Sequence, residues 1–525
     1  MKTISPPGIF NDAIGPIMRG PSSSHTAGSH RIGRVLRQLA GSSIARATFT
    51  FHNDGSLATT YQTQGSDIGL AAGLLDMEIT NPNMSKSLAI ARQQGIDIIF
   101  NIEDYPAEHP NTYACHILLK NGSELNARAL STGGGLIELR SLNGYEFSRS
   151  MDLPTLFIQG SSALVNKYSD QLYSDPAFVT KVFRSESFSK HDSELLIIEF
   201  STQEVTLPKD NSDKLLWRFV DPVYPVLGYT GSTLPFLSAG DLEDSPELLK
   251  KELWELAVEY ESARSGLSRD EVLVRMKEMV SVIMEAIDTG LSGTKYPDRI
   301  LGAQSPVFIK AMQNGKLLPG GPLEKMTAYI MAIMESKSAM EVIVAAPTAG
   351  AAGGLPGAII GMAEELGASL DQIIKAFLAA GLIGVFISRD ATFAAEVAGC
   401  QAETGTGAGM AAAGMIQLAN GTAKEALGAA SIALQNVMGL ICDPVANRVE
   451  VPCLSRNVQS GANALASANM ILGGVDPVIP LSETIKTLLD VGKALPRELR
   501  CTALGGLSLT KTAKEIEKRL RGERK

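Results

Sequence analysis

The stretch VIVAAPTAGAAGGLPGAIIGMA, Val342 to Ala363, decides the fold of the second half of this chain, because it consists almost entirely of glycine, alanine and a few large apolar residues. A second stretch, Thr404 to Ala423, has a similar composition and also lacks charge. Small residues let buried helices approach one another closely, and glycine-rich turns let backbone come close to a ligand. We therefore expect both stretches in the interior of an all-α domain.

Both stretches are about as long as a membrane span, so a membrane transporter is an alternative interpretation. Pro347 and Pro356 interrupt the first stretch, Gln417 and Asn420 lie in the second, and Leu, Ile, Val and Phe are scarce in both. Hydropathy of this kind argues against spanning helices. The transporter would require the protein to sediment with membranes.

Helical signals begin upstream of these stretches. A segment rich in Gly, Pro, Ser and Thr, Gly228 to Asp244, is the best candidate domain boundary. After it, Ser245-Pro246 predicts a helix start with proline at the first helical position, and Ser268 with Glu271 forms a capping box. The sequence therefore predicts an all-α domain over residues 241–525.

The first part of the chain has strand signals instead. Ala47 to Phe51 alternates as a half-buried strand does, Asn121-Gly122 is a hairpin signal, and a helix is expected near Asp67 to Leu75. We expect an α/β domain over residues 1–145 and a small α+β insertion or regulatory segment over 146–240. The whole chain is thus an α+β multidomain protein.

Composition and net charge limit the class of protein to which this chain can belong. The 525 residues are 45% hydrophobic, and 47 Lys+Arg against 56 Asp+Glu give a net charge of −9. These values exclude a disordered or fibrous chain and argue against a partner that is nucleic acid or an anionic membrane. Met1 to Phe10 holds no signal-peptide core. The odd count of five cysteines then fits a reduced, cytoplasmic protein.

Histidines and cysteines lie in different halves. All six histidines precede residue 192, and four of the five cysteines follow residue 399. Cys400, Cys442 and Cys453 each stand beside Gly, Asp or Pro rather than within an apolar stripe. Three thiolates suit an iron–sulfur cluster with one iron left open, although cysteines in a Gly/Ala-rich core are also ordinary small apolar residues.

Several motifs carry a family resemblance. Residues 344–353 (VAAPTAGAAG), Gly399-Cys400-Gln401, Cys442-Asp443-Pro444 and Val451-Pro452-Cys453 resemble, in order and spacing, the α portion of iron–sulfur-dependent L-serine dehydratases. The β portion of that family is similar to Gly20-Pro21-Ser22-Ser23-Ser24-His25-Thr26-Ala27-Gly28, His109-Pro110-Asn111-Thr112 and Ser131-Thr132-Gly133-Gly134-Gly135. The resemblance covers roughly residues 5–140 and 245–515, so it implies a single chain with fused β and α portions.

The resemblance implies L-serine as substrate, an N-terminal serine-dehydratase β-type domain and a 4Fe-4S cluster in the helical domain. The open iron acts as a Lewis acid while L-serine is converted to pyruvate and ammonia, a step of amino-acid catabolism that feeds gluconeogenesis, in a homodimer. It implies three metal ligands, two catalytic histidines and eight substrate-binding residues: Cys400, Cys442, Cys453; His25, His109; Ser22, Ser23, Ser24, Thr26, Asn111, Thr112, Thr348 and Gly350. Asp443 and Glu403 are candidate supporting groups around the cluster.

This sequence departs from the family at two informative positions. Gln64 stands where relatives usually have a histidine, and a glutamine cannot act as a base near neutral pH. Cys501 is a candidate fourth cluster ligand or else a plain thiol. Two alternatives to the serine dehydratase therefore stay open: a lyase for a related β-substituted amino acid, and a non-catalytic amino-acid sensor.

Overall fold

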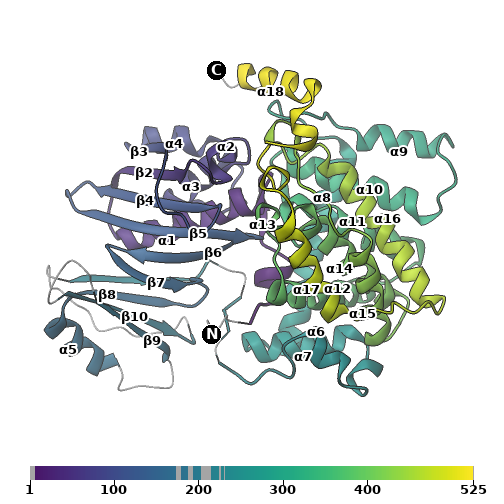
Figure 1. Cartoon of the computed structure of the whole chain (residues 1–525), viewed down its shortest axis with the longest axis horizontal. Helices are drawn as coiled ribbons and strands as arrows, with labels where there is room; N and C mark the ends of the chain where they lie inside the picture. The colour runs from purple at the N-terminus through teal and green to yellow at the C-terminus, as the bar shows by residue number, and fades with distance from the viewer. Residues whose placement is uncertain are drawn as a thin grey trace.

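The computed structural model describes residues 6–172, 179–186, 193–202, 215–223, 226–229 and 231–523. A sheet-rich N-terminal part and a helical C-terminal part lie side by side (Figure 1). This arrangement confirms the predicted fold class. The domain boundaries near residues 145 and 240 stay a prediction.

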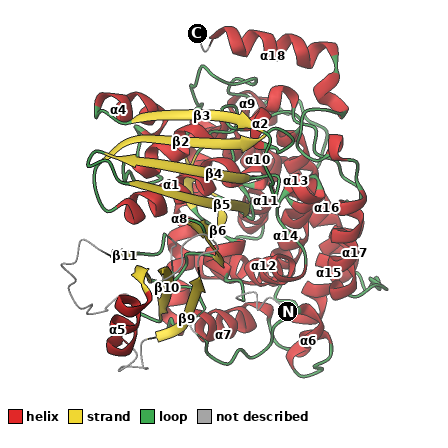
Figure 2. Cartoon of the chain, turned by 60° about the vertical axis from the view of Figure 1, so that its left-hand side comes forward, coloured by secondary structure: helices red, strands yellow, loops and turns green. Residues whose placement is uncertain are grey.

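The N-terminal part is built on a six-stranded sheet in the order β3-β2-β4-β5-β6-β7 (Figure 2). Only β2 and β3 pair in parallel. The predicted strand Ala47–Phe51 lies within β2, and Asn121-Gly122 turns β4 into β5, as expected. The strands are β2 (Ile44–His52), β3 (Asp97–Glu103), β4 (Thr112–Leu119), β5 (Glu124–Gly133), β6 (Leu136–Leu142) and β7 (Tyr145–Arg149).

Helices cover one face of this sheet. Val35 and Leu36 of α1 pack with Phe49 and Phe51 of β2 and with Leu70 of α3 in one buried core. The expected helix near residues 67–75 is α3. The helices are α1 (Gly28–Ala40), α2 (Leu57–Thr60), α3 (Ser66–Leu74) and α4 (Ser87–Gln93).

The middle segment forms a second, antiparallel sheet in the order β11-β8-β10-β9. Alternate residues of β10 face two cores: Leu195 and Ile197 join the core of the first sheet, while Leu196 and Ile198 pack with Val165 of α5. This segment is therefore folded structure rather than a bare linker. Its elements are β8 (Thr155–Ser161), α5 (Ser162–Leu172), β9 (Val179–Glu186), β10 (Ser193–Phe200) and β11 (Leu216–Val220).

The C-terminal part is a bundle of closely packed helices. A Cβ atom on Gly357 of α11 would lie 2.5 Å from the backbone nitrogen of Ile330 in α10, so only glycine permits this approach. The helices are α6 (Ala239–Glu243), α7 (Leu253–Ser265), α8 (Arg269–Ser292), α9 (Ser305–Gln313), α10 (Pro322–Ser338), α11 (Gly354–Glu365), α12 (Leu370–Asp390), α13 (Ala395–Ala398), α14 (Thr404–Leu418), α15 (Ala423–Gln435), α16 (Cys453–Leu472), α17 (Leu481–Ala494) and α18 (Lys511–Glu523).

One predicted helix start is wrong and one is confirmed. Ser268 and Glu271 do form the capping box of α8. Ser245-Pro246 instead leads into a short 3-10 turn, and the helix begins only at Leu253. The chain is extended at Lys251, whose carbonyl accepts a hydrogen bond of 2.7 Å from the backbone of Ala423, at the start of α15. This long-range contact overrides the local helix signal.

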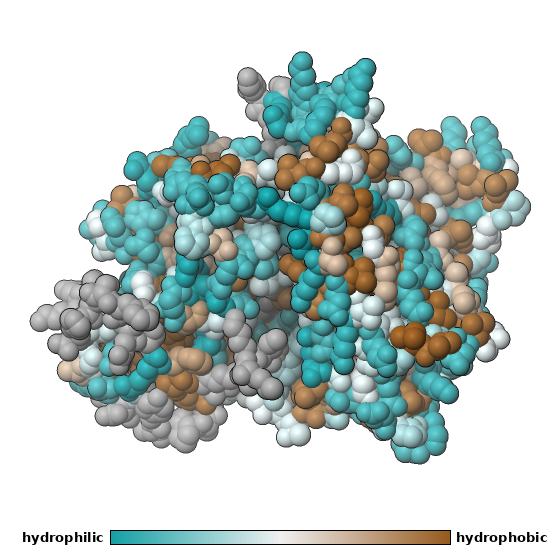
Figure 3. All heavy atoms as spheres, viewed as in Figure 1, coloured by the Kyte–Doolittle hydropathy of each residue, from teal (hydrophilic) through white to brown (hydrophobic). Residues whose placement is uncertain are grey.

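Within the described ranges, one helix is long and apolar enough to cross a membrane, and it is α12. Of its most apolar window, 78% is buried, and α12 packs against α7, α8 and α14. The two uncharged stretches of the sequence instead form β12 (Val342–Val344) with α11, and α14. Hydrophilic side chains cover much of the face in Figure 3, where apolar spheres gather in patches rather than in a belt. These features are those of core helices.

The N-terminal segment ties the two parts together. The helical turn Ile9–Ala13 packs against α12, and β1 (Ile17–Arg19) pairs antiparallel with β12 of the helical part. The chain then crosses back through the loop Gly20–Ala27 into α1. The serine-rich loop therefore lies at the junction of the two parts.

A buried ionic cluster lies beneath this segment. Arg264 of α7 is 1% exposed, and the carboxylates of Asp12, Asp152 and Glu261 lie 3.9–4.0 Å from its guanidinium. Glu261 also accepts a 2.7 Å hydrogen bond from the backbone of Ile9. Burial outweighs the effect of Arg264 and raises the pKa of Asp12 to about 6 and that of Glu261 to about 7.

These raised pKa values predict a pH-dependent stability. The folded chain binds protons at Glu261 more tightly than the unfolded chain, so this group's contribution to stability is lost as pH rises toward 7, by up to about 1.4 kcal/mol per pH unit. We expect Glu261→Gln to reduce the fall in thermal midpoint between pH 5 and pH 7.5. Glu259→Gln, on an exposed position of the same helix, is the control. An unchanged pH dependence in Glu261→Gln would contradict this prediction.

Candidate active site

Four cysteines meet where the helical part faces the N-terminal loop. Cys400, Cys442 and Cys501 form one buried cluster, and Cys442, Cys453 and Cys501 line a single cavity of about 20 Å³. All five cysteines of the chain are described, and all are free thiols. Cys115 lies apart from the other four, buried in β4.

Local backbone structure holds each thiol. Cys400 opens a 3-10 turn after α13, and Cys453 is the first residue of α16. Cys442 and Cys501 are tied by a 3.0 Å hydrogen bond from the backbone nitrogen of Cys501 to the carbonyl of Cys442. Cys501 itself has a φ of 57°, an uncommon conformation for a non-glycine residue. The C-terminal loop is thus folded so that a fourth thiol reaches the site.

An arginine supports negative charge on one of these thiols, Cys400. Nη1 of Arg456 lies 3.5 Å from Sγ of Cys400, and its Nη2 donates to Asp443 at 2.7 Å. A hydrogen bond with Cys442, and next the Arg456 charge, lower the pKa of Cys400. Asp443, a candidate supporting residue, thus orients Arg456.

The serine-rich loop reaches the same cavity. Ser22 and Ser24 line it, and the hydroxyl of Ser24 donates to Oε1 of Glu396 at 3.0 Å. His25 lies fully buried behind them. Its Nδ1 is 3.0 Å from Oγ of Ser24 and 3.5 Å from Oε1 of Glu396, and its Nε2 is 2.9 Å from Oγ1 of Thr60.

Two carboxyl groups line the cavity in opposite electrostatic settings. Burial raises the pKa of Glu396, but the facing His25 and several hydrogen bonds outweigh it, and the net pKa lies below the usual value. Glu403 accepts a 2.8 Å hydrogen bond from Thr348, and burial together with the nearby Cys400 raises its pKa to about 8. Two carboxyl groups at one cavity whose pKa values are shifted in opposite directions can serve as a base and an acid.

Gln64 also lines the cavity. The hydroxyl of Thr26 donates to the backbone carbonyl of Gln64 at 2.8 Å, and the Gln64 amide donates to Sγ of Cys501 at 3.7 Å. Gln64, which stands where relatives usually have a histidine, therefore supplies a hydrogen-bond donor and no base.

The predicted site residues fall into three groups, and their roles stay predictions. Lining the cavity are Ser22, Ser24, Gly350, Cys442, Cys453 and Cys501. One layer behind, in contact with lining residues or the turn beside them, are Ser23, His25, Thr26, Thr348 and Cys400. Outside the lining are His109, Asn111 and Thr112, which hydrogen-bond among themselves.

Asn111 nevertheless belongs to the surroundings of the site. It is fully buried beside Glu396 and helps to lower the pKa of that carboxyl. In the described part of the chain, its amide oxygen and nitrogen have no well-aligned hydrogen-bond partner. A buried polar group without such a partner is typical of a functional site.

Glu396 is the residue that sequence reasoning missed. It is the only charged residue from Ala391 to Ala402, a signal that could have drawn attention to it. An acidic residue near a cysteine also fits a simple helix-end charge, and its contacts with Ser24 and His25 span about 370 positions of sequence.

The donor set fits an iron–sulfur cluster. Thiolates are the ligands such clusters take; three thiols line one cavity, and Cys400 with a nearby guanidinium lies directly behind them. Glu403 and the sulfurs of Cys400 and Cys442 also lie within 4.8 Å of one another. A helical domain with a buried, thiol-lined site that also contains two carboxyl groups is an arrangement that suits a metal-assisted enzyme.

Comparison with known proteins identifies the family. Residues 249–508 match the family "Serine dehydratase alpha chain". The probable L-serine dehydratase alpha chain of Bacillus subtilis (strain 168) is 35% identical over 255 residues, 49% of this chain and 85% of that protein. The L-serine dehydratase alpha chain of Peptoniphilus asaccharolyticus is 33% identical over 267 residues, 51% of this chain and 91% of that protein. The chain belongs to the L-serine dehydratase family.

The N-terminal portion has its own counterpart. The probable L-serine dehydratase beta chain of Bacillus subtilis (strain 168) is 44% identical over 147 residues, 28% of this chain and 66% of that protein. Matches to separate alpha and beta chains thus occur within one polypeptide. This finding supports the predicted fused chain.

Proposed function

We propose that this protein is an L-serine ammonia-lyase with a 4Fe-4S cluster held by Cys400, Cys442 and Cys453. The supporting observation is one cavity lined by Cys442, Cys453, Glu396, Glu403 and the serine-rich loop, with Cys400 behind its wall in contact with Cys442. When bound, the cluster supplies a Lewis acid that polarises the substrate hydroxyl as a leaving group.

Side chains of the protein bind the substrate and transfer the protons. Ser22 donates a hydrogen bond to the substrate carboxylate at the junction of the two parts, while Ser24 keeps its hydrogen bond to Glu396. A carboxylate oxygen of Glu396 accepts the α-proton, and the imidazole of His25, whose Nδ1 lies 3.5 Å from Oε1 of Glu396, holds that carboxylate in place. Glu403 gives its proton to the departing hydroxyl, so that water leaves and 2-aminoacrylate remains. That product tautomerises and is hydrolysed to pyruvate and ammonia.

Cys501 has a further role in this proposal. It lies against Cys442 and accepts a hydrogen bond from Gln64. We infer that it completes the ligand set until the substrate binds. We also infer a cytoplasmic homodimer that degrades serine and feeds gluconeogenesis, as the family resemblance implies.

Anaerobic reconstitution tests the proposed activity. We expect brown protein with about four iron and four sulfide per chain, and release of pyruvate from L-serine. Removing iron by chelation should abolish both the colour and the activity, and L-threonine and L-cysteine test the related substrates. Binding of L-serine without pyruvate release by fully loaded protein would favour the non-catalytic sensor instead.

A further inference from the structure

The cavity lined by Cys442, Cys453 and Cys501, here called the reacting cavity, is too small for an amino acid, so a substrate needs a route to it. Its volume of about 20 Å³ has room for about one water molecule. Ser22, Ser24 and Cys453 on its wall are each less than one tenth exposed. An amino acid can therefore enter only when part of this wall moves.

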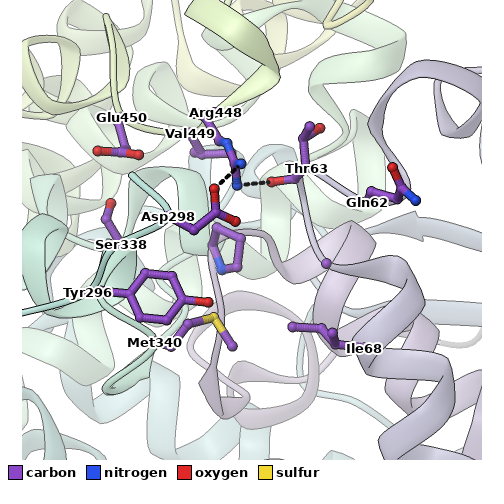
Figure 4. A pocket seen from close by; sticks show the side chains of 12 residues that line it. Gln62, Thr63, Ile68, Tyr296, Asp298, Ser338, Met340, Arg448, Val449 and Glu450 are labelled. Atoms are coloured by element: carbon purple, nitrogen blue, oxygen red, sulfur yellow. Dashed lines mark hydrogen bonds and ion pairs between the residues drawn. The ribbon is translucent and has the colours of Figure 1, made fainter. Parts of the chain in front are cut away.

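A second cavity adjoins this wall, and Figure 4 shows side chains that line this second cavity. It measures about 40 Å³ and shares Val449 with the reacting cavity. Pro21 and Gly65 line it, and their chain neighbours Ser22 and Gln64 line the reacting cavity. One layer of residues thus separates the two spaces.

The second cavity lies on the seam between the two parts of the protein. Arg448 reaches across it: the guanidinium forms an ion pair with Asp298 and donates to the carbonyl of Thr63 at 3.3 Å (Figure 4). The amide of the preceding Asn447 donates to the carbonyl of Thr59 at 3.0 Å. These contacts close the seam.

The backbone around Arg448 is held firmly. The backbone nitrogen of Arg448 donates to the carbonyl of Val445 at 3.0 Å, and the backbone nitrogen of Val445 donates to the carbonyl of Val451 at 2.8 Å. The ammonium group of the fully buried Lys337 donates to the carbonyl of Val449. Movement at this wall is therefore left to the side chains of Arg448 and Val449 rather than to the backbone.

The charges of the second cavity complement an amino acid. Separating Arg448 from Asp298 with nothing between them would leave two poorly hydrated charges, which is costly. A zwitterion placed between them keeps both charges paired, because its carboxylate meets Arg448 and its ammonium meets Asp298. A neutral molecule of the same size has no such compensation.

We propose that the substrate enters through this second cavity by inserting between Arg448 and Asp298, with the Val449 side chain as the last barrier. Arg448 is then a positioning and selectivity residue and takes no part in the chemistry. The inference rests on the proposed function in one respect, that the substrate is an amino acid.

Kinetics of the loaded enzyme give the first test. Losing a charge-assisted contact of about 1.5–3 kcal/mol corresponds to about a 10–100-fold change. We expect Arg448→Ala to lower kcat/KM for L-serine by that factor, with kcat within about threefold of wild type, and Arg448→Lys to recover part of the loss. Arg46→Ala is the control, because it removes an exposed arginine of β2 that pairs with Asp97 of β3, and neither residue lines either cavity.

Thiol access in the metal-free full chain gives a second, independent readout. We expect iodoacetamide to alkylate Cys453 about tenfold faster in Arg448→Ala than in wild type or Arg46→Ala, because removing the charged bridge opens the route. L-serine should slow alkylation of wild type but not of Arg448→Ala. Unchanged alkylation or unchanged kcat/KM in Arg448→Ala overturns the route. A wild type without pyruvate release overturns the proposed function alone, since alkylation still reports on access.

Discussion

Cys442→Ala is expected to abolish pyruvate formation from L-serine and to leave the protein without its brown chromophore. Cys442 is the central thiol of the site, because it contacts both Cys400 and Cys501 and lines the cavity beside Cys453. A cluster that polarises the leaving group is worth several kcal/mol, so activity should fall by at least about a thousandfold. Iron content, the absorption spectrum and pyruvate release measure the effect.

Two other cysteines provide matched comparisons. Cys115→Ala removes a buried thiol of β4, remote from the site, and should keep iron and activity. Cys501→Ala should keep iron but change the Mössbauer spectrum of the substrate-free cluster, because one iron loses a thiolate. Full iron and activity in Cys442→Ala would contradict the ligand assignment, and an unchanged spectrum in Cys501→Ala would contradict the fourth ligand.

The sequence predicts the site best where functional residues stand in short motifs. Cys400, Cys442 and Cys453 stand in short motifs with turn-forming neighbours, and the structure gathers them as the family order suggests. The absence of histidine from the second half indicated that the first half contributes to the site. Ser24 and His25 do reach Glu396 across the junction.

The rest depended on contacts between distant segments. Nothing near Glu396 in sequence shows that Ser24 and His25 will face it. The failed helix start at Ser245-Pro246 has the same cause, since the carbonyl of Lys251 bonds to Ala423 instead of continuing a helix. The pairing of β1 with β12, which carries the serine-rich loop to the cysteines, is likewise a tertiary property. The helix or strand propensity of a segment does not predict its contacts with distant segments.

The acid–base proposal turns on Glu396, and Glu396→Gln is expected to lower kcat for L-serine by about a hundredfold to ten-thousandfold. Glutamine keeps the size of the side chain and can still accept the hydrogen bond from Ser24, but it cannot take up a proton. The thiols are untouched, so iron content and the spectrum of the loaded protein should match wild type. The loss then reflects proton transfer rather than a missing cluster.

Isotope exchange separates proton transfer from every later step. In D₂O, wild type should exchange the α-hydrogen of L-serine for deuterium. With L-serine deuterated at the α-carbon, wild type should show a primary isotope effect. Glu396→Gln should do neither while still binding L-serine. Glu403→Gln is the matched control, because it removes the other carboxyl of the same cavity. If Glu403 is the acid, that variant slows loss of the hydroxyl but leaves α-hydrogen exchange in place. Exchange lost in Glu403→Gln and kept in Glu396→Gln would reverse the two roles, because the group that accepts the α-proton must be the one whose removal stops its exchange.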